Sequence, residues 1–188
     1  MTSRGNVQLN QLLFWFAGCV TVQLVIPALV VKLVLRDRLR DYGIKLGGFF
    51  SCFWIYVLML AVCLPLVVLV SGTARFQETY PYYRLAPGEP LWPNVWAWKG
   101  LHAIQFFSLE FFFRGFLVHG TRHRFGRYAI FVMAVPYCMI HFGKPMPETF
   151  ASIAAGLGLG FMSLKTRSIW MGTAVHISVA LAMDLAAL

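Results

Sequence analysis

Residues 108–115 read SLEFFFRG and place two charged side chains, Glu110 and Arg114, inside an otherwise apolar run. The two residues are four positions apart, so on an α-helix they share a face and can form an ion pair. Charged side chains are costly at membrane depth and normally face a bundle interior or a water-filled cavity. The stretch therefore predicts a buried functional site on a helix, with a structural ion pair that locks a helix bundle as the alternative.

The composition of the chain is that of a membrane protein. Of its 188 residues, 59% are hydrophobic and 12% are charged, which is about half the charged share of a typical soluble domain. Several apolar runs reach the roughly 20 residues that a helix needs to cross the hydrocarbon core. We therefore expect an all-α, polytopic membrane helix bundle that forms a single domain over residues 1–188.

The apolar runs predict about six transmembrane helices, and the basic residues between them predict their orientation. Dense Lys and Arg clusters occupy the first, third and fifth connectors, which the positive-inside rule places in the cytoplasm, with both termini outside. These short connectors account for the net charge of +9, so no nucleic-acid partner is expected. The expected spans are residues 11–35, 48–70, 99–120, 128–142, 148–164 and 168–188.

Two further features have structural explanations, and a third has a structural and a functional interpretation. The four cysteines lie in apolar runs without CxxC spacing, which indicates packing and not disulfides or a zinc site. The glycines of residues 156–160 lie inside an apolar helix, where they indicate close helix packing and not a nucleotide-binding loop. The connector 71–97 is rich in Pro, Tyr and Trp, and an interfacial aromatic belt and a substrate-gating lid are both open interpretations.

Further polar residues lie at membrane depth on later helices: His141, His176 and Asp184. A carboxylate such as Glu110, helped by one imidazole, can deprotonate a water, and a second imidazole can donate to the oxyanion that forms. Two histidines and a carboxylate also suit zinc, but the HExxH pattern is absent, so zinc ranks second and no cofactor is expected. The remaining histidines are expected to be interfacial: His102, His119 and His123.

Three motifs in this order resemble those of the CAAX-processing and bacteriocin-processing (CPBP, or Abi) family of intramembrane endopeptidases. They read EFFFRG at residues 110–115, YCMIH at residues 137–141 and VH at residues 175–176. The segment DYGI at residues 41–44 also resembles this family, and the resemblance covers roughly residues 40–185. It implies a helical intramembrane peptidase in which a glutamate activates the attacking water.

The first motif of the family reads Glu-Glu-x-x-x-Arg, and this chain departs from it at one position. Glu110 corresponds to the second Glu and Arg114 to the Arg. Leu109 stands where the family has its first Glu, the proposed general base. The resemblance therefore leaves Glu110 as the base of a divergent active member, or implies a member that has lost catalysis.

The second and third motifs supply the histidines. The aromatic residue and histidine of the second motif correspond to Tyr137 and His141, with His141 as the partner that helps to activate water. His176 matches the third motif, His-x-x-x-Asn or Asp, but Ala180 stands at its last position. Asp184, one turn further along, is the candidate substitute if it reaches back along the helix.

The resulting expectation is a glutamic-type endopeptidase that cleaves a membrane-anchored protein substrate within the lipid bilayer. Water is activated by Glu110 with His141, and His176 supports the oxyanion. Some bacterial relatives are thought to process C-terminal sorting signals, so we expect a multi-pass protein of the bacterial cell membrane with its site toward the outer leaflet. The alternatives are a catalytically inactive immunity or binding factor, which Leu109 and Ala180 favour, and, less favoured, a zinc metalloprotease or a small transporter.

Overall fold

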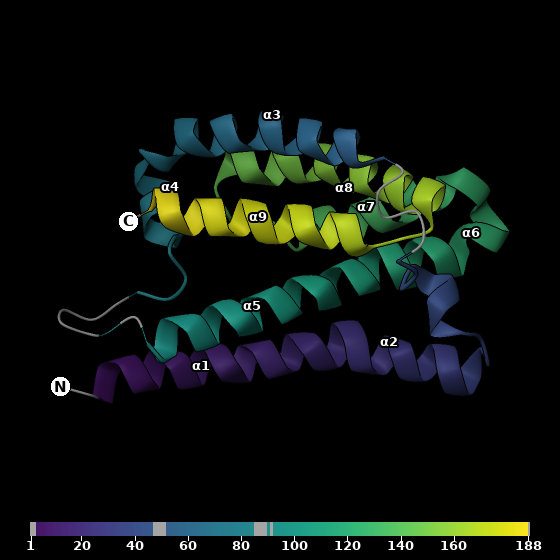
Figure 1. Ribbon diagram of the computed structural model, residues 1–188, viewed down its shortest axis with the longest axis horizontal. Coiled ribbons are helices and arrows are strands. Elements are labelled where there is room, and N and C mark those ends of the chain that lie inside the picture. The colour runs from purple at the N-terminus through teal and green to yellow at the C-terminus, as the bar shows by residue number, and fades with distance from the viewer. Residues whose placement is uncertain (1–2, 47–51, 85–89, 91, 188) are drawn as a thin grey trace.

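The computed structural model describes residues 3–46, 52–84, 90 and 92–187, and these residues form an all-α bundle (Figure 1). The described residues contain no β-sheet, and their one isolated bridge joins Ile44 to Ser168. Three helical stretches among them are long and apolar enough to cross a membrane: Gln8–Val34, Phe53–Ser71 and Asn94–Met139. The expected fold class, an all-α membrane helix bundle, is confirmed.

The chain begins with one long helical rod. Helix α1 (Ser3–Val20) continues through a wide π-helical segment (Thr21–Val25) into α2 (Ile26–Leu29) and a second wide segment (Val30–Val34). The buried Pro27 lies between the two wide segments. Because proline has no backbone N–H, it removes one helical hydrogen bond, and the neighbouring turns widen around the gap.

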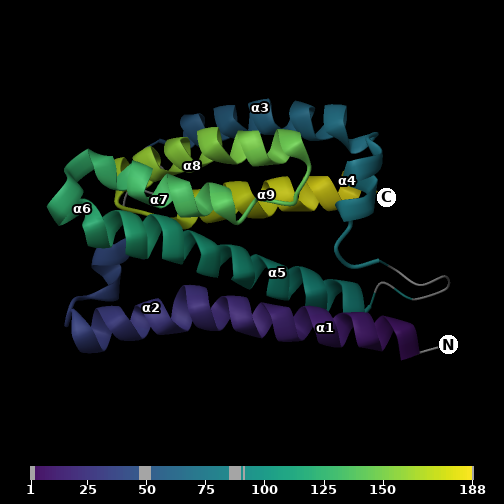
Figure 2. The ribbon, with the colours of Figure 1, turned by 180° about the vertical axis from the view of Figure 1, so that it is seen from behind.

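The later helices pack in two layers (Figures 1 and 2). The long rod lies beside α5, while α3, α7, α8 and α9 form the second layer, and α9 contacts both α3 and α5. Each of the six expected spans is largely helical, although the start of the second span, at residues 48–51, falls outside the described residues. The helices after α2 are α3 (Phe53–Ser71), α4 (Ala74–Thr79), α5 (Asn94–Glu110), α6 (Gly120–Phe125), α7 (Ala129–Met139), α8 (Met146–Thr166) and α9 (Trp170–Ala186).

Helix α5 ends at Glu110, and the chain continues as a wide π-helical segment, Phe111–His119, that carries Arg114. Wide segments of this kind leave some backbone carbonyls without an α-helical partner, and they occur often at functional sites. Here the hydroxyl of Ser163 on α8 donates to the carbonyl of Arg114 at 3.3 Å. Glu110 therefore lies at the junction between two helical geometries.

Close approaches at three glycines hold neighbouring segments of the bundle together. The connector after the rod forms a short 3₁₀ turn (Leu39–Tyr42) whose Tyr42 carbonyl lies so near Gly115 that a Cβ there would be 2.6 Å from it. On α8, a Cβ at Gly156 would be 2.9 Å from the Tyr137 ring, and one at Gly160 would be 2.8 Å from Met133. The glycine run is therefore a packing surface against α7, as the sequence predicted.

Replacing Gly115 with Ala should destabilise the protein by about 1–3 kcal/mol, because the added methyl group meets a backbone carbonyl that has little room to move. The matched control is Gly100→Ala on α5, where no atom lies within 4 Å of the new Cβ. That control should be stabilising by about 0.5–1 kcal/mol, since alanine is the better helix former. Melting temperatures of the purified variants in detergent measure both effects, and equal shifts would contradict the packing argument.

Candidate active site

Glu110 is the most enclosed acidic residue of the site. Its side chain is 0% exposed, and so is that of Arg114, whose Nη1 lies 3.0 Å from Glu110 Oε1. The same carboxylate oxygen lies 2.6 Å from Nδ1 of His176 on α9. The predicted ion pair therefore exists, and a histidine from the opposite layer completes it. A carboxylate at this depth is tolerated because the guanidinium compensates its charge and the imidazole donates a hydrogen bond.

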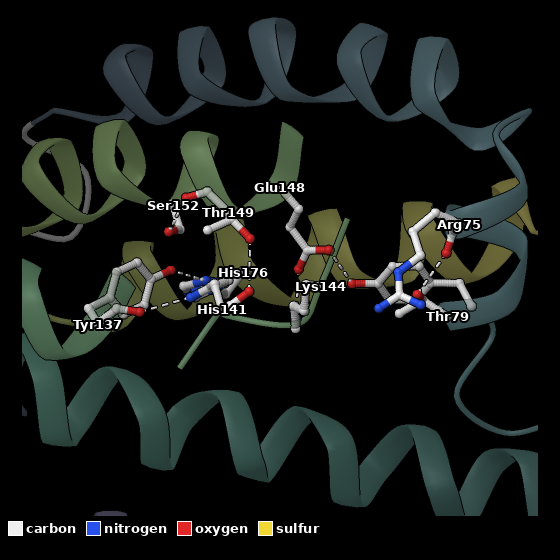
Figure 3. Close-up of polar contacts among 10 residues, drawn as sticks. Arg75, Thr79, Tyr137, His141, Lys144, Glu148, Thr149, Ser152 and His176 are labelled. Atoms are coloured by element: carbon white, nitrogen blue, oxygen red, sulfur yellow. Dashed lines mark hydrogen bonds and ion pairs between the residues drawn. The ribbon is translucent and has the colours of Figure 1, made fainter. Parts of the chain in front are cut away.

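The imidazole of His176 links the carboxylate to a phenol. Its Nε2 lies 2.9 Å from the hydroxyl of Tyr137 on α7 (Figure 3). When Nδ1–H donates a hydrogen bond to Glu110, Nε2 carries a lone pair and accepts a hydrogen bond from the Tyr137 hydroxyl. Carboxylate, imidazole and hydroxyl thus form one chain in the order seen in hydrolases that use an oriented histidine base.

His141 joins the same cluster one turn after Tyr137 (Figure 3). Its Nδ1–H donates to the Tyr137 carbonyl at 2.8 Å, which fixes the ring, and the two rings lie 4.8 Å apart between centroids. The Arg114 guanidinium lies over the face of the same tyrosine, 3.9 Å from its centroid. Four of the five residues expected from the sequence therefore meet around Tyr137: Glu110, Arg114, His141 and His176.

Asp184 does not belong to this group. It is buried near the far end of α9, where it forms an ion pair with Lys99 of α5. Eight residues of helix separate it from His176, which is roughly 12 Å along the axis. Asp184 therefore does not meet the condition under which it would replace the last residue of the third motif, because a carboxylate side chain is much shorter than that distance.

Two of the histidines expected at the membrane interface have their side chains buried within the protein. His102 and His119 are each only 6% exposed. The His102 ring stacks on Trp98 and packs against Phe106, with centroids 4.9 and 4.6 Å away, and Phe106 in turn stacks on His176 at 5.4 Å. The spacing of residues 98, 102 and 106 places these rings on one helix face, and that periodicity was the available signal.

The second oxygen of Glu110 faces α9. Oε2 is buried without a hydrogen-bond partner among the described residues, and a Cβ at Gly172 would lie 2.6 Å from it. Helix α9 can therefore approach the carboxylate only because residue 172 has no side chain. This close approach places His176, one turn later on α9, within reach of Oε1.

Next to His141, a second polar cluster fixes the connector between α7 and α8 (Figure 3). The Lys144 ammonium lies 2.6 Å from Glu148 Oε1, and the Tyr80 hydroxyl donates to Glu148 Oε2 at 2.7 Å. Burial and the neighbouring carboxylate raise the pKa of Tyr80, so its hydroxyl remains a donor.

Tyr80 belongs to the connector 71–97, for which an aromatic belt at the lipid headgroups was one interpretation. Tyr80 is 3% exposed and Trp92 is 73% exposed, so such a belt fits only the later aromatic residues of the connector 71–97.

The donors needed for a metal do not gather in this site. Among the residues that the structure describes, no three His, Cys, Asp or Glu side chains lie close enough together to hold a metal ion. The side chain of Arg114 fills the space beside the carboxylate with a positive charge. The residues present do not fit zinc, and no step of the chemistry below uses it.

The fold and the site together define a polytopic helical membrane protein with a buried Glu–His–Tyr chain at its centre. Residues 90–182, about half of the chain, match the family model described as type II CAAX prenyl endopeptidase Rce1-like. The chain therefore belongs to the CPBP family, as its motifs predicted, and is an integral membrane protein of the intramembrane protease type. No curated protein and no solved structure matches the chain.

Replacing Arg114 with Met should destabilise the protein by about 3–5 kcal/mol, since Glu110 would remain buried without its counter-charge. The control is Lys45→Met, which removes an ion pair of the same i, i+4 spacing from a carboxylate that is 49% exposed. That change should cost less than about 1 kcal/mol. If thermal unfolding gave the two variants similar losses, Glu110 and Arg114 would not be a desolvated pair.

Replacing Gly172 with Ala should displace Glu110 or α9, because the new methyl group overlaps the position of Oε2. We expect a loss of about 1–3 kcal/mol in the free energy of unfolding and a weaker contact between Glu110 and His176. Gly158→Ala on α8 is the control, as its new Cβ meets only Met59 at an ordinary 3.6 Å. Histidine NMR shifts and melting curves measure the contact and the stability, and an unchanged His176 signal would contradict this prediction.

Proposed function

We propose that this protein is an active intramembrane endopeptidase that hydrolyses a peptide bond of a membrane-anchored protein, with His176 as the base that activates water. The observation that carries the proposal is the hydrogen-bonded chain from Glu110 through His176 to Tyr137. In it, one imidazole nitrogen is oriented by a carboxylate while the other faces a hydroxyl. That arrangement provides a base whose tautomer is fixed and whose protonated form is stabilised by the carboxylate.

In the proposed reaction, water takes the place of the Tyr137 hydroxyl at Nε2 of His176. Nε2 removes a proton as the water oxygen bonds to the scissile carbonyl carbon, and Glu110 stabilises the imidazolium that results. The carbon–nitrogen bond then breaks, and the same proton passes from Nε2 to the leaving amine. Arg114 contacts no reacting atom and acts by keeping Glu110 ionised.

The oxyanion of the tetrahedral intermediate requires a separate donor. The displaced hydroxyl of Tyr137 is the proposed one, while His141, whose Nδ1–H donates to the Tyr137 carbonyl, packs against that ring and positions it. These assignments exchange the roles expected from the sequence, where Glu110 acted on water and His176 on the oxyanion. The exchange is favoured because Oε1 of Glu110 already has two partners and Oε2 is buried against Gly172.

The surroundings of His141 favour a substrate that is itself in the membrane. A groove of about 630 Å³ lies against the connector that follows His141, with Cys138, Phe142, Phe150 and Ile153 among its lining residues, although His141 itself does not line it. Its walls are mostly apolar, which suits a hydrophobic polypeptide segment that arrives from the bilayer. C-terminal sorting signals of exported bacterial proteins are the substrate class that we propose for it.

We also propose that the end with the basic connectors faces the cytoplasm of a bacterial cell, by the positive-inside rule. Both chain termini lie at the opposite end of the bundle (Figure 1), so this orientation would place them outside. His141, which follows α7 and precedes α8, would then lie in the outer half of the bilayer. Labelling of single cysteines beside His141 from the outside alone would support this orientation.

A catalytically inactive binding or immunity factor is the second candidate, and Leu109 favours it. The side chain that replaces the family's first Glu is 6% exposed and belongs to an apolar cluster with Phe113, Ile130 and Met133. This position therefore contributes packing and has no polar group to offer to water. Whether Glu110, His176 and Tyr137 are sufficient without it is the question that separates the two candidates.

The test compares the membrane-protein termini of bacterial cells that express the wild type, His176→Gln or His123→Gln. An active peptidase generates new termini with the wild type, and these should fall by about 10²–10⁴-fold in His176→Gln. They should persist in His123→Gln, because that histidine is exposed at the end of α6. No new termini with the wild type would support the inactive factor, and new termini that persist in a folded His176→Gln variant would refute the proposed base.

A further inference from the structure

Three connectors that are far apart in the sequence meet at the end of the bundle opposite the two termini (Figure 1). Residues 36–45 carry four Lys or Arg, residues 122–127 carry three and residues 165–167 carry two, which makes nine basic side chains. The only acidic residues in these segments are Asp37 and Asp41. We call this surface the basic end.

The three connectors form one surface. Lys45, Arg122 and Arg167, one from each connector, all act electrostatically on the same buried His119. The backbone of Ile169 donates to the carbonyl of Gly43 at 3.0 Å and ties the third connector to the first. Positive charges from three segments are thus held side by side, although they repel one another.

Two of these arginines have a backbone conformation that favours glycine. Arg36 and Arg167 have φ angles of 57° and 54°, and they are the only non-glycine residues with positive φ in the described part of the chain. Arg167 caps the C-terminus of α8, a position where glycine is usual. The local backbone does not favour arginine at either position, so its presence there supports a role for the side-chain charge.

The residues next to the basic end indicate which class of ligand it binds. Phe125 and Tyr128 flank Arg127 and are 47% and 67% exposed. Exposed aromatic rings beside basic residues, at the end of apolar helices, lie at the depth of the lipid headgroups. Clusters of Lys and Arg at that depth attract anionic lipids within about a Debye length. An acidic soluble protein as the partner would account for the basic residues but not for the exposed rings of Phe125 and Tyr128 beside them.

We propose that the basic end binds the headgroups of anionic phospholipids, which bridge the three connectors and neutralise their mutual repulsion. The proposal does not depend on catalysis. It has a consequence for the site, because the first connector packs its Tyr42 carbonyl against Gly115, the residue after Arg114. Lipid at the basic end therefore stabilises the π-helical segment that carries Arg114.

The test places the purified protein in nanodiscs of phosphatidylcholine alone or with 30% phosphatidylglycerol. Phosphatidylglycerol should raise the melting temperature of the wild type by about 2–6 °C at low salt, and this rise should fade at high salt. The double variant Arg36→Gly, Arg167→Gly should melt higher than the wild type in phosphatidylcholine, since its backbone strain is relieved. It should nevertheless gain less from phosphatidylglycerol, a combination that a purely structural role for these arginines does not produce.

The control variant is Arg75→Gln with Arg84→Gln, which removes the same number of charges from residues outside the basic end. It should keep the full response to phosphatidylglycerol, and native mass spectrometry should find anionic lipid retained on it as on the wild type. An equal response of both double variants, or no preference of the wild type for the anionic lipid, would overturn the proposal. Stabilisation by a soluble polyanionic peptide in the absence of any lipid preference would also overturn it.

Discussion

The charge of Glu110, which is closed off from water, is the constraint that the rest of the structure satisfies. A carboxylate with no exposed surface is tolerated only with a counter-charge and good hydrogen-bond donors. Arg114 supplies the charge from the next turn, and His176 supplies a donor from the other layer. Gly172 lets α9 come close enough for that donor to reach. The two layers of the bundle are thus joined at their most polar point.

The irregular backbone around the site follows from the same constraint. The π-helical segment begins directly after Glu110 and changes the register of the side chains that follow, including Arg114. Its carbonyl at Arg114 is satisfied by Ser163, and its Gly115 accommodates the connector that contains Tyr42. Helices α5, α8 and α9 and the first connector therefore all contact a stretch of six residues. The charged pair is held by the whole bundle and not by its own helix alone.

The spacing of residues along the sequence predicted the contacts within one helix. It did not predict the contacts between different helices. The i, i+4 pair, the glycine packing surface on α8 and the all-α fold follow directly from periodicity and composition. Asp184 was a candidate only if it reached back along its helix, and it instead pairs with Lys99 of α5, a partner that spacing along one helix does not predict. The hydroxyl of Tyr137 was missed because its partner, His176, belongs to another helix. Contacts between helices depend on packing details that one sequence does not display.

The replacement of the family's first Glu by Leu109 can be understood from the geometry of a helix. Adjacent residues point about 100° apart, so Glu110 faces α9 while Leu109 enters the apolar cluster with Ile130 and Met133 of α7. A carboxylate at position 109 would have to displace that cluster or draw water into it. The chain thus retains the acidic residue that contacts His176 and replaces its neighbour with an apolar packing residue. The mechanism that we propose accordingly places its base on the side of α9, where His176 lies.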